Sequence, residues 1–199
     1  MKKQNLVHRA LIGAALAAVA ATAHAHTGHG TGTVLEGVMH PLGLDHLLAM
    51  VAVGLWSVFC LPAARAWAGP AVFMAALMAG AVAGVMGLAL PMGEALVAAS
   101  VVLCGWMLVL ATRRTPGRSG LGWVVLAGVL HGLAHGAEAP AGGFAGYAAG
   151  FLLTTGVLHL GGVMLGWTVV KRFAQRAQLW AGGIGCGFAG AGVYLLSQV

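Results

Sequence analysis

The chain has 199 residues, of which 60% are hydrophobic and only 7% are charged. A water-soluble domain needs far more polar residues to cover its surface, so this composition excludes a soluble globular protein and indicates an integral membrane protein. The formal net charge of +6 does not indicate nucleic-acid binding, because the basic residues lie in short clusters between apolar runs. We therefore expect contact with the lipid bilayer and no nucleic-acid partner.

The first residues have the pattern of a secretory signal peptide. Two lysines and an arginine precede a short alanine-rich run, which ends in Ala23-His24-Ala25, the small-x-small sequence that signal peptidase cuts. This predicts a signal peptide over residues 1–25 and a mature chain over residues 26–199. The alternative is an uncleaved seventh membrane helix, which the shortness of the run disfavours.

Six apolar runs follow, each near or above the ~20 residues with which an α-helix crosses a bilayer. They cover roughly residues 35–60, 67–90, 93–111, 120–137, 143–170 and 177–198. The sequence therefore predicts an all-α fold, in which residues 26–199 form a single bundle of six transmembrane helices.

Glycine is abundant, with 33 residues, and recurs at small-xxx-small spacing. Examples are Gly80/Gly84, Gly132/Gly136 and Gly183/Gly187. Helices in lipid associate by close backbone approach, which small residues permit, so these pairs predict tight helix packing.

The basic residues of the mature chain predict its orientation. All of them fall in the first, third and fifth connections between the apolar runs, namely Arg65, Arg113, Arg114, Arg118, Lys171, Arg172 and Arg176. Lysine and arginine concentrate in cytoplasmic connections, which predicts a multi-pass protein of the bacterial inner membrane with both termini periplasmic. Cleavage of a signal peptide at the outer face requires the same orientation of the mature N-terminus.

The fourth run contains VLHGLAHGAE, where His131, His135 and Glu138 lie four and three residues apart. On an α-helix all three project from one face. An ionisable side chain at the centre of a membrane helix costs roughly 2.5–3.5 kcal/mol on insertion scales, so such groups usually mark a site or a pathway. This predicts a metal path, with hydrogen bonds between packed helices as the alternative.

A second polar group occurs in the first run, where His40, Asp45 and His46 lie in the predicted outer half of the helix. The fourth helix runs in the opposite direction, so the two polar groups should converge near the outer side. Imidazoles and a few carboxylates suit divalent Ni²⁺, Co²⁺, Cu²⁺ or Zn²⁺. His159 stands alone near mid-membrane, either as a further ligand on the path or as a histidine bonded to a neighbouring helix.

Local sequence divides the roles within the first group. Proline lacks an amide hydrogen and fits the first turn of a helix, which predicts that the regular helix begins near Pro41 with His40 at its mouth. Asp45 and His46 are adjacent and point about 100° apart, so only one of them can aim squarely at the fourth helix. We expect His46 to be the ligand and Asp45 either to orient it or to lower the cost of the cation.

The segments HPLGLDHLLAMVAVGLW and LHGLAHGAE resemble the two signature segments of the HupE/UreJ family. The members are bacterial membrane proteins regarded as secondary permeases for nickel, in some cases cobalt, that serve hydrogenase and urease maturation. The resemblance covers the layout of the whole mature chain and implies a set of transport residues, His40, Asp45, His46, His131, His135 and Glu138.

The sequence departs from the family pattern at two places. Leu130 stands where the family usually has phenylalanine, and four residues rather than five separate His40 from Asp45. His40 and His46 are therefore six residues apart instead of seven, and on a regular helix they do not share a face.

These observations predict a secondary permease that takes up Ni²⁺ as its transported substrate, not an enzyme, with no tightly bound cofactor. The sequence has no GxxxxGK[ST] loop and no ATPase subunit is expected. An inside-negative potential favours uptake of a divalent ion by roughly twice 2.3 kcal/mol per 100 mV. The alternatives are a cobalt permease of the same kind, or an intramembrane zinc hydrolase in which Asp45 activates water. A purely structural subunit leaves the polar groups unexplained.

Overall fold

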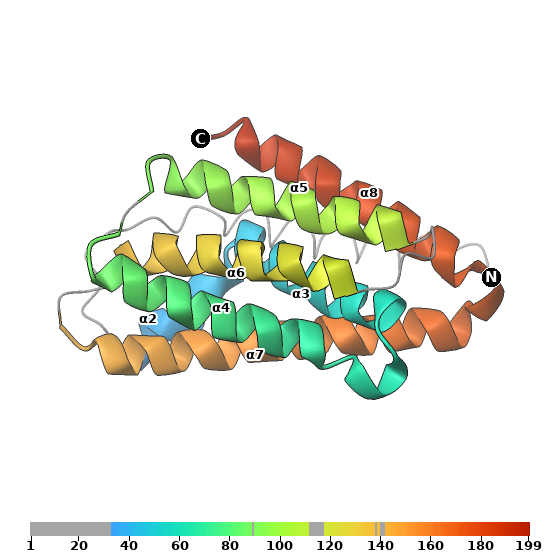
Figure 1. The fold of residues 1–199 in the computed structure, drawn as a ribbon, viewed down its shortest axis with the longest axis horizontal. Coiled ribbons are helices and arrows are strands. Elements are labelled where there is room, and N and C mark those ends of the chain that lie inside the picture. Colours follow the sequence, from blue (N-terminus) through green and yellow to red (C-terminus); the bar gives the residue numbers. More distant parts are fainter. Residues whose placement is uncertain (1–32, 89, 112–117, 138, 140–141) are drawn as a thin grey trace, which may run out of the picture.

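The computed structural model describes residues 33–199 apart from 89, 112–117, 138 and 140–141. These residues form helices joined by turns, with no strand among them (Figure 1). The predicted signal peptide and Glu138 lie outside the described residues.

The helices follow one another with short connections. Their order is α2 (Val34–Met39), the 3₁₀ turn η1 (His40–Leu42), α3 (Leu44–Cys60), η2 (Ala63–Arg65), α4 (Ala68–Val85), α5 (Gly93–Ala111), α6 (Arg118–Ala137), α7 (Phe144–Arg172), η3 (Ala174–Arg176) and α8 (Ala177–Leu196). In the described chain, five helices are long and apolar enough to cross a membrane, and the bent pair of α2–η1 and α3 makes a sixth span when taken together. The prediction of an all-helical, multi-pass bundle is thus confirmed.

The prediction of one continuous helix over residues 35–60 is wrong. The segments on either side of Gly43 are bent by 74°. Pro41 lies in the turn η1 and Gly43 has an extended ψ of 144°, so the α-helical hydrogen bonds stop and restart at Leu44. The regular helix α3 therefore begins three residues later than the sequence predicted, and a capped helical turn, α2, precedes it.

Thr33 explains why α2 starts where it does. Its hydroxyl accepts a hydrogen bond from the Glu36 backbone N–H at 3.2 Å, and the Glu36 carboxylate accepts one from the Thr33 N–H at 3.1 Å. This reciprocal capping box satisfies two backbone donors that have no partner within the helix.

Close glycine contacts join α4 to α6, which pack along each other in the same direction. A Cβ built on Gly132 would lie 2.9 Å from the Gly80 Cα and 2.7 Å from the Ala81 N, so only glycine permits this approach. The prediction of tight packing is wrong for Gly183 and Gly187 of α8, where an added Cβ meets open space within the chain.

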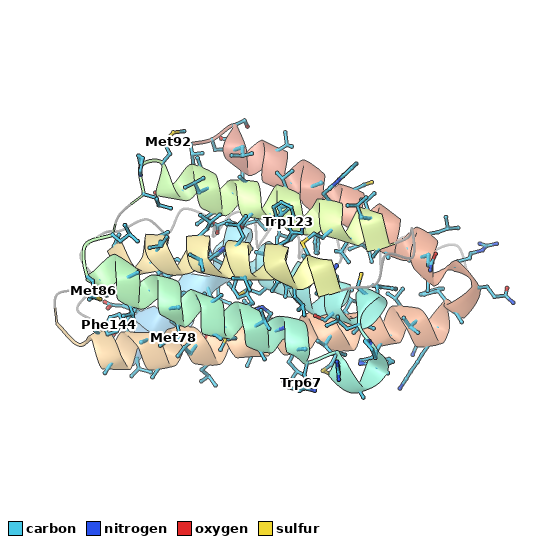
Figure 2. The ribbon with its side chains drawn as sticks, viewed as in Figure 1. Trp67, Met78, Met86, Met92, Trp123 and Phe144 are labelled. Atoms are coloured by element: carbon cyan, nitrogen blue, oxygen red, sulfur yellow. The ribbon has the colours of Figure 1, made fainter. Side chains whose placement is uncertain are left out.

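The core surrounds α3, which contacts α4, α5, α7 and α8. Met50, Leu55 and Phe73 are fully buried there, whereas the outer surface is apolar. Figure 2 shows Met78 and Trp123 among the side chains on this outer surface, and they are 36% and 52% exposed. Large exposed apolar side chains are expected for helices that contact lipid.

The spans alternate in direction, so that the basic residues at their ends gather at one end of the bundle (Figure 1). Arg65 lies in η2 after α3, Lys171 and Arg172 end α7, and Arg176 lies in η3 before α8. The last turn of α6 lies at the opposite end, and α3 begins partway along the bundle, beyond α2 (Figure 1).

Candidate functional site

Three histidines from the first and fourth spans meet in the half of the bundle away from the basic residues. His40 comes from η1, His46 from the first turn of α3 and His135 from the last turn of α6. One ring nitrogen of each lies within 4.8 Å of the others. We call these residues the three-histidine cluster. Among the described residues, this is the one group of three or more histidine, cysteine or acidic side chains with that spacing.

The bend at Gly43 is what brings His40 to the cluster. On a regular helix, residues six apart do not share a face. Across the bend, the rings of His40 and His46 have centroids 5.5 Å apart and interplanar angle 87°. A Cβ built on Gly43 would lie 3.0 Å from the Asp45 Oδ1, so a larger residue would crowd the carboxylate.

Asp45 orients His46. Its Oδ1 lies 2.6 Å from the His46 Nδ1 and also accepts the His46 backbone N–H at 2.8 Å. An ionised carboxylate only accepts hydrogen bonds, so Nδ1 carries the proton and Nε2 of a neutral imidazole keeps its lone pair. The contact is the one expected from the sequence, and it directs the unprotonated Nε2 toward His135.

The contacts among the three rings form an ordered chain. The His46 Nε2 lies 2.5 Å from the His135 Nε2, and the His40 Nε2 lies 3.0 Å from the His135 Nδ1. Because His46 accepts at Nε2, a neutral His135 donates from Nε2 and accepts at Nδ1, where His40 donates. Each contact then has one donor and one acceptor, and the chain of hydrogen bonds ends at the Asp45 carboxylate.

His131 adjoins the cluster without belonging to it. It is fully buried, and its ring centroid lies 5.1 Å from that of His46. Its Nδ1–H donates to the Ala127 carbonyl at 2.9 Å and lies 3.4 Å from the Ser100 Oγ. Its Nε2 is therefore an unprotonated acceptor, and this atom has no hydrogen-bond partner.

His159 lies deeper in the bundle, on α7, and is 1% exposed. Its Nδ1–H donates to the Thr155 carbonyl of its own helix at 2.8 Å, and its Nε2 has no hydrogen-bond partner. The alternative of a hydrogen bond to a neighbouring helix is thus wrong. The centroid of the Phe73 ring lies 4.9 Å from that of the His159 ring and 5.5 Å from that of the His131 ring.

Aromatic side chains of α7 form an apolar wall that the sequence analysis missed. Tyr147 and Phe151 each have ring centroids 5.8 Å from that of His40, and Phe151 lies 4.8 Å from His135. A cavity of about 20 Å³ beside them, also lined by His135, has room for about one water molecule. The one available signal was the helical spacing of the two aromatic residues, which is equally typical of ordinary packing.

The donor set is of the kind that binds divalent transition metals. Imidazole nitrogens suit nickel, cobalt, copper and zinc, and a hydrogen-bonded carboxylate behind a ligating histidine fixes its tautomer and raises its basicity. The thiols do not contribute, because Cys60, Cys104 and Cys186 are all free and none belongs to the cluster. The fold and the site together define a multi-pass membrane protein with buried side chains of the kind that ligate metal ions.

Comparisons with known proteins identify the family. The family described as HupE / UreJ protein matches residues 14–195. Protein HupE of Rhizobium leguminosarum bv. viciae is 40% identical over 182 residues, which cover 90% of this chain and 92% of the relative. The chain therefore belongs to the HupE/UreJ family, whose members are nickel and cobalt transporters rather than enzymes. No solved structure shows a significant match.

Proposed function

We propose that the protein is a secondary permease that takes up Ni²⁺ across the bacterial inner membrane and supplies hydrogenase or urease maturation. Co²⁺ is the alternative substrate, since it accepts the same nitrogen and oxygen ligands. The observation that carries the proposal is the meeting of three imidazoles from two spans, with nitrogens within 4.8 Å, in a member of a metal-transporter family.

The cluster suits reversible capture of an ion. His40 is half-buried while His46 and His135 are buried, so the ion meets His40 first and loses its remaining water as it reaches the other two. Neutral imidazoles ligate the ion without adding fixed charge to the bilayer, and the Asp45 carboxylate offsets part of the ion's charge. Glu138, three residues beyond His135, is proposed to act with them at the entrance.

The orientation follows from charge. The basic ends of α7 and η3 lie opposite the cluster, and the positive-inside rule assigns them to the cytoplasm. The cluster then faces the periplasm, and the membrane potential pulls a divalent cation from it toward the cytoplasm.

The direct test is uptake of radiolabelled Ni²⁺ by cells that lack their other nickel transporters. The wild-type chain should restore uptake, and Co²⁺, which accepts the same ligands, should compete with Ni²⁺. His46→Ala and His135→Ala should abolish high-affinity uptake while the protein remains inserted and abundant. Wild-type rates in both variants would refute the proposed role of the cluster.

A further inference from the structure

Four buried side-chain atoms in the described chain lack a hydrogen-bond partner, and three of them belong to α6 and α7 on the deeper side of the cluster. The four are the Ser57 Oγ, the His131 Nε2, the Thr155 Oγ1 and the His159 Nε2. A buried polar atom without a partner costs about 1–3 kcal/mol, so several of them in one region need an explanation.

The two histidines are held in the same tautomer by the same device. In each, Nδ1–H donates to the carbonyl four residues earlier, Ala127 for His131 and Thr155 for His159. A carbonyl cannot donate, so both Nε2 atoms are lone-pair donors ready for a metal ion. Their exposed fractions of 0% and 1% keep bulk water away from these nitrogens.

Contacts place the two histidines in one region. Both rings touch the fully buried Phe73 ring, His131 from α6 and His159 from α7. Thr155 lies one turn before His159 on the same face of α7, and its side chain is also fully buried. The two helices thus carry two unpartnered imidazole nitrogens on rings beside Phe73 and, one turn before His159, an unpartnered hydroxyl oxygen.

The same region lies further from the entrance than the three-histidine cluster. His159 follows Tyr147 by twelve residues, about 18 Å along the helix axis at 1.5 Å per residue. The ring of His131 touches both His46 of the cluster and Phe73 of the deeper region. An ion leaving His46 therefore meets His131 next.

We infer that His131, His159 and Thr155 form a second metal-binding station, separate from the three-histidine cluster, which receives the ion after it leaves His46. The inference rests on the proposed function, since it assigns the next ligands for the same substrate. Transport then proceeds by transfer between two sets of neutral imidazoles, without release of the ion into the apolar core.

The test measures Ni²⁺ binding by equilibrium dialysis with the purified full chain in lipid nanodiscs. The variant His46→Ala/His135→Ala lacks the cluster and should still bind one Ni²⁺ per chain. Adding His159→Ala to it should remove that binding. In cells, His159→Ala alone should lower the rate of nickel uptake at least tenfold while capture at the cluster persists.

Two threonines supply a matched pair of milder variants in the cluster-free background. Thr155→Val should weaken Ni²⁺ binding about tenfold, since it removes an oxygen ligand and keeps the side-chain shape. Thr154→Val should leave that affinity unchanged, because the Thr154 hydroxyl already donates to the Val38 carbonyl at 2.9 Å.

The outcomes separate this inference from the proposed function. If the wild-type chain neither binds nor transports Ni²⁺, the proposed function fails. If the wild type does both, but the cluster-free variant binds no Ni²⁺ and His159→Ala transports at the wild-type rate, only the second station is refuted.

Discussion

Replacing Asp45 by asparagine separates the charge of the carboxylate from its geometry. The amide oxygen of asparagine can still accept from the His46 Nδ1–H and backbone N–H, now at 2.6 and 2.8 Å, so the ring should keep its place. What is lost is the negative charge, which makes the hydrogen bond to the His46 ring charge-assisted and offsets part of the ion's charge. Removing such a partner of a ligating histidine typically lowers metal affinity 10–100-fold, about 1.4–2.7 kcal/mol.

The assay is nickel uptake measured against external Ni²⁺ concentration at matched membrane abundance. Asp45→Asn should raise the concentration for half-maximal uptake by about 10–100-fold. The matched control is Glu36→Gln, which also turns a carboxylate into an amide, in the capping box of α2. This control should change the half-maximal concentration less than twofold. An unchanged half-maximal concentration in Asp45→Asn would refute the role of the Asp45 negative charge in metal binding.

Three further perturbations test the entrance, the orientation and the bend. Glu138→Gln should abolish high-affinity uptake with the protein still abundant in membrane immunoblots; uptake at the wild-type rate would remove Glu138 from the site. A reporter active only in the cytoplasm should be active when fused after Arg118 and silent after Gly142, and the reverse pattern would turn the cluster toward the cytoplasm. Gly43→Val should lower the apparent nickel affinity about tenfold, because the added side chain crowds Asp45. Gly122→Val adds its side chain in open space and should leave the affinity unchanged. Equal effects of the two variants would assign the loss to general destabilisation.

Most helix boundaries could be predicted from the sequence, because a membrane helix is set by the length of its apolar run. The run 93–111 matches α5 at both ends, and the run 143–170 lies within two residues of α7 at each end. The prediction of a continuous helix over the run 35–60 was wrong, because hydropathy measures the length of an apolar run and is insensitive to a bend. Pro41 and Gly43 were the local signals, and their spacing of two residues allowed a turn that neither residue alone required.

The site was predictable to the extent that it follows from helical spacing. The contact of Asp45 with His46 involves neighbours in sequence, and the meeting of His46 with His135 followed from the opposite directions of two spans. The contacts of Phe73 with His131 and His159 join three separate helices. Such contacts depend on how the helices rotate against each other, which helical spacing within one span does not determine.

The two proposed stations differ in the hydrogen bonds that an arriving ion must displace. At the cluster, His40, His46 and His135 already bond to one another, so each nitrogen that turns to the ion gives up a hydrogen bond worth a net ~0.5–1.5 kcal/mol. That exchange keeps capture weak enough to be reversible. At the second station the His131 and His159 Nε2 atoms have no bond to lose, and their burial cost of about 1–3 kcal/mol each is relieved when the ion arrives. In the proposed orientation, the ligand energetics and the membrane potential act in the same direction and favour movement of the ion from the cluster to the proposed second station.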